Sequence, residues 1–320
     1  MDSHEASNKR AIYASLAGNI GIALSKFVAA AVSGSSAMMS EAIHSLVDTS
    51  NQVLLLLGLR ESKVPANEEF PYGRGKAVYF WGLIAIFIFT LGGFYSFYQG
   101  VQHVIHPHEI ENAGLNYAIL GFAFILEAMA WRVGVVEFRQ TKGDASYLDA
   151  VRNAKDPSIA ILIFENSADM IGILVAFFGI LLTQVTGILY FDGIASMIIG
   201  VILIMAALWL AHETKSLLIG EGADKQIIQG IRGLVSAQGE IRSIEEITTL
   251  HMGPEFVLVN MRVRFDDSAL AADIALVTDF LEAQICDLFP LVKRVYVKAS
   301  AGPKSHEQIA RLLHHPVARE

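Results

Sequence analysis

The chain has 320 residues, of which 53% are hydrophobic and only 18% are charged. Because soluble domains carry roughly 25% charged residues, this composition predicts that much of the chain lies in lipid. The net charge of −8 argues against nucleic acid as a partner, since a nucleic-acid surface needs a basic patch.

Six apolar segments approach the roughly 20 residues that an α-helix needs to cross a bilayer. They cover residues 11–33, 36–59, 78–102, 115–136, 157–183 and 190–212. A short Ser-Gly-Ser turn joins the first two segments, which predicts an antiparallel hairpin. Residues 1–212 are therefore predicted to form a domain of six transmembrane helices.

The distribution of Lys and Arg predicts that both termini face the cytoplasm. Basic residues occur before the first segment and in the turns after the second and fourth, whereas the turns at 33–36, 103–114 and 184–189 have none. The N-terminal MDSHEASNKR has no apolar core of its own, so we expect the first helix to act as the insertion signal. This pattern is compatible with a multi-pass protein of a bacterial inner membrane.

Residues 213–300 are predicted to form a cytoplasmic domain with the element order αββαβ. We expect a helix at 224–237, strands at 242–251 and 255–265, a helix that Ser268 caps and Pro290 ends, and a third strand at 291–299. The apolar stripe of the second helix comprises Leu270, Ile274, Val277, Leu281, Ile285 and Leu288. The single cysteine, Cys286, fits a reducing compartment, and residues 301–320 are predicted to be a flexible tail.

Two pairs of metal-ligand residues lie inside the apolar segments. His44 and Asp48 are in the second segment, and Glu165 and Asp169 are in the fifth. An ionisable group at mid-bilayer costs at least about 2.5–3.5 kcal/mol, so such groups usually face a cavity, a partner or an ion. The i, i+4 spacing places each pair on one helix face. If the two faces meet, one imidazole and three carboxylates form a cage for a divalent cation.

Zn²⁺ suits four ligands with mixed nitrogen and oxygen donors. A single nitrogen and no thiolate leave Mn²⁺, Fe²⁺ and Co²⁺ as alternatives. Packed carboxylates repel one another unless a cation or protons balance them, and we expect basic residues only at the helix ends. Because metal ligands must be deprotonated, a site that alternately faces two compartments would exchange metal for protons.

Other polar residues occur near the same helix faces. Glu41 shares a stripe with His44, Asp48 and Asn51; we expect it to be solvated near the helix end, with an outer ligand role as the alternative. We interpret His103, His106 and His108 as solvated loop residues and His251 as a packing residue, with a ligand role for His251 as its alternative. The remaining polar residues of interest are Asn19, Lys26, Glu127 and Asp192.

These features together resemble the cation diffusion facilitator family of metal/proton antiporters. The resemblance lies in SGSSAMMSEAIHSLVDTSNQ, FPYGRGKAVYFWGL, YFDGIASMIIGVIL and LLIGEGAD. The segments KDPSIAILIFENSADMIG and LHMGPEFVLVNMRVRF are similar to the zinc-transporter-9-type branch. The resemblance implies a homodimer, formed through the transmembrane and C-terminal domains, with a ferredoxin-like cytoplasmic domain. It also implies that the protein exports divalent metal in exchange for protons. It also implies that His44, Asp48, Glu165 and Asp169 form the transport site.

The chain departs from this family in its soluble parts. Phe70 and Arg74 stand where histidines often occur before the third segment, and Glu245 and Arg262 replace histidines of the tail domain. We therefore predict no metal cluster in the tail, and dimerisation through packing and salt bridges. The alternatives are a proton-coupled carrier for an organic cation and an intramembrane metalloenzyme. The enzyme is disfavoured because the chain has no H-E-x-x-H motif.

Overall fold

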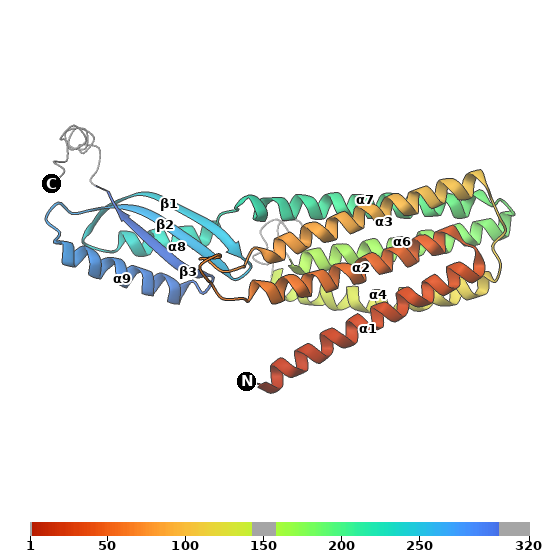
Figure 1. Cartoon of the computed structure of the whole chain (residues 1–320), viewed down its shortest axis with the longest axis horizontal. Helices are drawn as coiled ribbons and strands as arrows, with labels where there is room; N and C mark the ends of the chain where they lie inside the picture. Colours follow the sequence, from red (N-terminus) through yellow and green to blue (C-terminus); the bar gives the residue numbers. More distant parts are fainter. Residues whose placement is uncertain (1, 143–157, 301–320) are drawn as a thin grey trace. The chain divides into compact units, whose positions relative to one another are not determined.

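The computed structural model describes residues 2–142 and 158–300 (Figure 1). The chain divides into two compact units. The first unit combines Met1–Arg60 with Phe80–Lys215, and the second combines Glu61–Tyr79 with Ser216–Glu320. The predicted flexible tail at 301–320, with its histidines, lies outside the described residues.

Long helices make up the first unit (Figure 1). Their bounds are α1 Asp2–Ser33, α2 Ser36–Ser62, α3 Ala77–Ile105, α4 Ala113–Lys142, α6 Ser158–Thr186 and α7 Tyr190–Ile219. All except α2 contain a stretch that is long and apolar enough to cross a membrane. The structure therefore supports five of the six predicted spans. Helix α2 has 27 residues, and Glu41, His44 and Asp48 lower its hydropathy.

Glycines bring α3 and α7 into close contact. A Cβ added at Gly100 would lie 2.5 Å from the carbonyl oxygen of Gly193, and one at Gly200 would lie 2.7 Å from that of Gly93. Small residues allow the two backbones to approach closely. This close packing stabilises the helix pair, because the hydrophobic effect does not drive helices together within lipid. Outward-facing side chains on the same helices, such as Phe87 and Phe94, are exposed and suit lipid contact.

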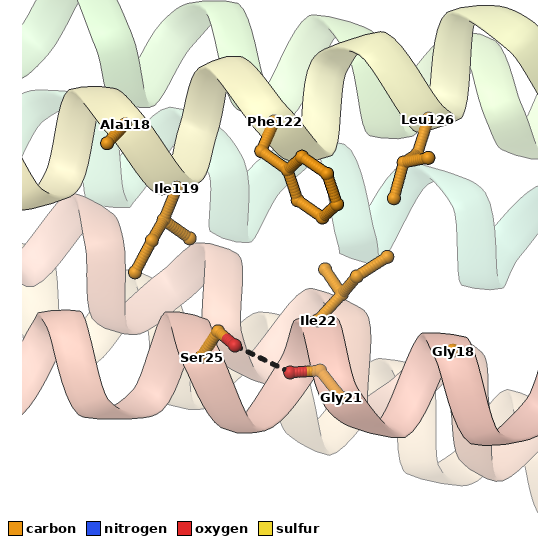
Figure 2. Close-up of a pocket in the computed structure, with 8 residues that line it drawn as sticks. All are labelled: Gly18, Gly21, Ile22, Ser25, Ala118, Ile119, Phe122 and Leu126. Atoms are coloured by element: carbon orange, nitrogen blue, oxygen red, sulfur yellow. Dashed lines mark hydrogen bonds between the residues drawn. The ribbon is translucent and has the colours of Figure 1, made fainter.

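An apolar groove of about 470 Å³ separates α1 from α4 (Figure 2). Ile22 of α1 and Ile119, Phe122 and Leu126 of α4 line it. The hydroxyl of Ser25, the one polar side chain among the lining residues, donates to the carbonyl of Gly21 and so is satisfied within α1. The groove therefore offers no ion ligands.

The second unit contains the element order α8 (Lys225–Ser236), β1 (Ile241–Gly253), β2 (Phe256–Phe265), α9 (Ala271–Leu288) and β3 (Val292–Ala299), which matches the predicted αββαβ order. The sheet order is β1-β2-β3, with β1 antiparallel and β3 parallel to β2. Alternate residues of β2, including Val259, Met261 and Val263, pack with α8 and α9 in one core. Both helices consequently cover one face of the sheet.

Three residues assigned to α9 from the sequence behave differently in the structure. Ser268 does not cap the helix, because its N–H and hydroxyl both donate to the carboxylate of Asp266. These hydrogen bonds lower the pKa of Asp266 from its ordinary value. Leu270 and Leu288, expected in the buried stripe, are 68% and 53% exposed. Both lie at helix ends, beyond the reach of the core.

The segment Glu61–Tyr79 packs against the β1–β2 hairpin and β3. A Cβ at Gly75 would collide with the carbonyl oxygen of Met252 and lie 3.1 Å from the Cα of Gly253. The guanidinium of Arg294 in β3 lies 5.8 Å from the ring centre of Tyr72. The connection between α2 and α3 is thereby held on the sheet.

Gly75→Ala should loosen this contact, because the added methyl group overpacks the approach to Met252 at a cost of about 1–3 kcal/mol. We expect faster tryptic cleavage at Lys63, Arg74 and Lys76 in detergent-purified protein. Gly233→Ala is the matched control, since a Cβ at Gly233 meets nothing within 4 Å. Equal cleavage rates in the two variants would contradict this contact.

Candidate metal centre

Helices α2 and α6 bring three of the predicted ligands together. His44 Nε2 lies 2.8 Å from Asp169 Oδ1 and 3.7 Å from Asp48 Oδ2. One ligand atom from each of His44, Asp48 and Asp169 lies within 4.8 Å of the other two, so the group has the dimensions of a metal site. The His44 side chain is 4% exposed and those of Asp48 and Asp169 are 25% and 17% exposed. The imidazole is therefore buried, and the two carboxylates are partly exposed.

Helical periodicity explains this arrangement. On α2, Glu41, His44 and Asp48 follow one another at i, i+3 and i+7 and therefore share one face. On α6, Asp169 lies one turn after Glu165 and one turn before Gly172. Because the two stripes face each other, the His44 imidazole of α2 contacts the Asp169 carboxylate of α6.

Glu165 is placed beside this group but outside its 4.8 Å limit. Its Oε1 lies 3.5 Å from the amide nitrogen of Asn51 on α2. Asn19 on α1 donates to Gln52 at 3.0 Å, so both asparagines make contacts between helices. Glu165 as a fourth ligand remains a prediction.

A buried lysine lies next to the site, contrary to the expectation that basic residues occur only at helix ends. Lys26 Nζ of α1 donates to Glu41 Oε2 at 2.9 Å and to Ser45 Oγ at 2.7 Å. Lys26 and Glu41 are 3% and 1% exposed. The prediction that Glu41 is solvated was therefore wrong. The apolar sequence around Lys26 could have indicated that this lysine is buried. Its partner could not be identified in the same way, because Glu41 lies on another helix.

The charges near the site do not balance. Among the described residues of this region, the groups that can be negative are Glu41, Asp48, Glu127, Glu165 and Asp169, whereas Lys26 and His44 can be positive. With Lys26 matched to Glu41 and His44 to Asp169, three carboxylates are left without a cationic partner. The excess negative charge favours a divalent cation or bound protons in this low-dielectric region.

A second polar cluster joins the α1–α2 turn to α3 and α7. The Asp192 carboxylate accepts from the Ser35 hydroxyl at 2.6 Å and from the Ser36 N–H at 2.6 Å. It thereby caps the N-terminus of α2. His103 Nε2 lies 3.7 Å from Asp192, and its ring is 4.3 Å from that of His108.

His103 is 2% exposed, so its prediction as a solvated loop residue was wrong, because α3 extends to Ile105. His106 and His108 are exposed, and His108 Nε2 contacts the carbonyl oxygen of Gly34 at 2.8 Å.

In the second unit, Arg262 forms an ion pair with Glu245 at 3.0 Å across β1 and β2. These residues replace the histidines expected from the family resemblance. The backbone N–H of His251 donates to the carbonyl of Glu221 at 2.9 Å. A ligand role for His251 and the expected lack of a tail metal cluster both remain untested.

Comparison with known proteins identifies the family. Residues 12–219 match the sequence profile of the cation efflux transmembrane domain. The chain therefore belongs to the cation efflux, or cation diffusion facilitator, family, as its motifs indicated. This family comprises cation efflux transporters rather than enzymes.

Several curated proteins are similar to this chain. The human mitochondrial proton-coupled zinc antiporter SLC30A9 is 32% identical over 245 residues, which are 75% of this chain and 43% of the human protein. Metal tolerance protein C4 of Arabidopsis thaliana is 27% identical over 77% of this chain and 55% of its own length. The cation-efflux pump FieF of Serratia proteamaculans is 24% identical over 83% and 84%, respectively. The chain thus spans less than half the length of the human relative.

Lys26→Met should destabilise the protein strongly, because it leaves the Glu41 carboxylate buried without its cation. Breaking one side of a buried ion pair costs about 3–5 kcal/mol, whereas replacing both sides with apolar residues is often neutral. We expect the midpoint of thermal unfolding in detergent to fall in the Lys26→Met variant. It should recover in the double variant Lys26→Met/Glu41→Leu. A lysine variant as stable as the parent chain would show that the pair is not formed.

Proposed function

We propose that this cation efflux protein exports a divalent transition metal, with Zn²⁺ as the preferred substrate, in exchange for protons. The observation that carries the proposal is the His44–Asp48–Asp169 group, whose ligand atoms converge within 4.8 Å inside the helical unit. The nitrogen and carboxylate donors suit Zn²⁺. The names of SLC30A9 as a proton-coupled zinc antiporter and of FieF as a cation-efflux pump support the same assignment.

The proposed transport site comprises His44 and Asp48 of α2 and Glu165 and Asp169 of α6. Glu165 joins the other three when the metal arrives, since it lies one helical turn from Asp169 on the same face. Metal binding requires neutral imidazole and ionised carboxylates, so loading releases protons. When the site faces the other compartment, protons compete for the same atoms and displace the metal.

The proposed topology has six transmembrane helices with both termini in the cytoplasm of a bacterial inner membrane. Helix α2 becomes the sixth span because its polar face is turned to α1 and α6, where Lys26 and Asp169 meet it. Membrane helices accept ionisable groups when these face the bundle interior. Labelling of a cysteine introduced at Asp279 by a membrane-impermeant reagent from one side only would test the tail's location.

The proposed functional unit is a homodimer with a ferredoxin-like tail domain. Leu276 and Phe280 on the outer face of α9 are 72% and 49% exposed. Paired apolar groups at i, i+4 on a soluble domain suit contact with a second copy. Leu276→Asp should therefore shift the detergent-purified protein from dimer to monomer in light scattering after size-exclusion chromatography. An unchanged mass would exclude α9 from the interface.

Asp169→Ala should abolish Zn²⁺-driven proton movement in proteoliposomes, because the carboxylate contacts His44 at the centre of the site. The assay follows a pH-sensitive dye after Zn²⁺ is added under an imposed pH gradient. Asp279→Ala, an exposed carboxylate of α9, is the matched control. Proton movement in Asp169→Ala equal to that of this control would refute the site.

The same assay with Mn²⁺, Fe²⁺, Co²⁺ and Cd²⁺ as competitors of Zn²⁺ identifies the preferred metal. An organic cation carrier, by contrast, would transport protons without any dependence on these metals.

A further inference from the structure

Glu41 of α2 faces the side of His44 that points away from the metal ligands. Glu41 Oε1 and His44 Nδ1 lie 4.0 Å apart. Both atoms are buried, and neither has a hydrogen-bond partner in the part of the chain that the structure describes. Two complementary polar atoms left unsatisfied beside each other are costly unless they pair in some state of the protein.

The orientation of the His44 imidazole suggests what a contact between its Nδ1 and Glu41 could do. His44 Nε2 is directed to Asp169 and Asp48, the proposed metal ligands. A histidine that ligates a metal through one ring nitrogen carries its proton on the other, and that N–H usually donates to a carboxylate or a carbonyl. With Nε2 on the metal, Nδ1 would carry the proton, and Glu41 Oε1, 4.0 Å away, is the acceptor beside it.

Glu41 is itself fixed by its neighbours. Its second oxygen, Oε2, accepts from Lys26 Nζ at 2.9 Å, and Lys26 also donates to Ser45. Gly172 of α6 provides the remaining space, since a Cβ there would lie 2.5 Å from Glu41 Oε1 and 3.3 Å from His44 Nδ1. Lys26 of α1 and Gly172 of α6 thus lie against this carboxylate of α2, and neither residue is itself a proposed metal ligand.

We propose that Glu41 is a positioning residue for the transported metal: it accepts the Nδ1–H of His44 and so directs Nε2 to the ion, while Lys26 holds Glu41 in place. This inference rests on the proposed function and deepens it. It extends the transport machinery to α1, through Lys26, although α1 supplies no ligand.

Paired substitutions separate this role from the stability of the ion pair. Lys26→Met/Glu41→Leu removes the acceptor without leaving a buried charge. Lys26→Met/Glu41→Gln also removes the ion pair but keeps an amide oxygen that can accept from Nδ1–H. Zn²⁺ affinity of the full chain in detergent, measured by competition with a fluorescent zinc chelator, should fall about 10–100-fold in the leucine variant. The glutamine variant should regain most of that loss.

Gly172→Ala tests the same contact with no change in charge or hydrogen-bonding groups. The added methyl group should displace the flexible end of Glu41 and weaken Zn²⁺ binding, whereas the fold should persist. Gly121→Ala on α4 is the control, because a Cβ there meets nothing within 4 Å. This variant keeps the inference testable if the leucine variant does not fold.

The outcomes distinguish the inference from the function on which it rests. Loss of Zn²⁺ binding in Asp169→Ala, together with unchanged affinity in the leucine variant and in Gly172→Ala, would overturn the role of Glu41 and leave the proposed function intact. Equal losses in the leucine and glutamine variants would also overturn it, since the acceptor would not matter. No Zn²⁺ binding by the unaltered chain would overturn both.

Discussion

The pairing of buried charges is the constraint on which the helical unit depends. Carboxylates in a low-dielectric interior persist only beside cations, protons or several donors. Lys26 meets Glu41 and His44 meets Asp169, each across a helix boundary at 2.9 and 2.8 Å. These contacts connect α1 to α2 and α2 to α6 through directional polar interactions. Close packing of small residues is not directional in this way. The remaining carboxylates give the interior a surplus of negative charge, and this surplus is the basis of the proposed cation binding.

Helix α2 illustrates how such a constraint couples structure to function. Among the described helices of the first unit, α2 is the one that lacks a long apolar window, and its polar residues Ser40, Glu41 and His44 are buried. Its polar face is stable only because neighbouring helices supply partners, and Asp192 supplies the cap at its N-terminus. The polar side chains on this buried face can take alternative partners, including metal ions and protons. The proposed exchange of metal for protons uses this property.

Much of the architecture was predictable because it depends on local periodicity. Apolar runs predicted the long helices, and alternation in β2 predicted its buried residues Val259, Met261 and Val263. Errors arose where the outcome depended on the ends of elements. Ser268 binds Asp266 instead of capping α9, Leu270 and Leu288 extend past the core, and α3 continues far enough to bury His103. At helix ends, several local hydrogen-bonding solutions differ little in free energy, so sequence patterns discriminate poorly among them.

The sequence by itself determined which residue types face the site, because i, i+3 and i+4 spacings fix neighbours within a helix. It therefore placed His44 with Asp48, and Glu165 with Asp169, on common faces, and it supplied the motifs of the family. Only the tertiary structure decided that Lys26 pairs with Glu41 and that Gly172 leaves room between Glu41 and His44. Contacts between helices depend on the rotation and separation of each helix. Packing along their whole length sets these quantities, and no short segment of sequence encodes them.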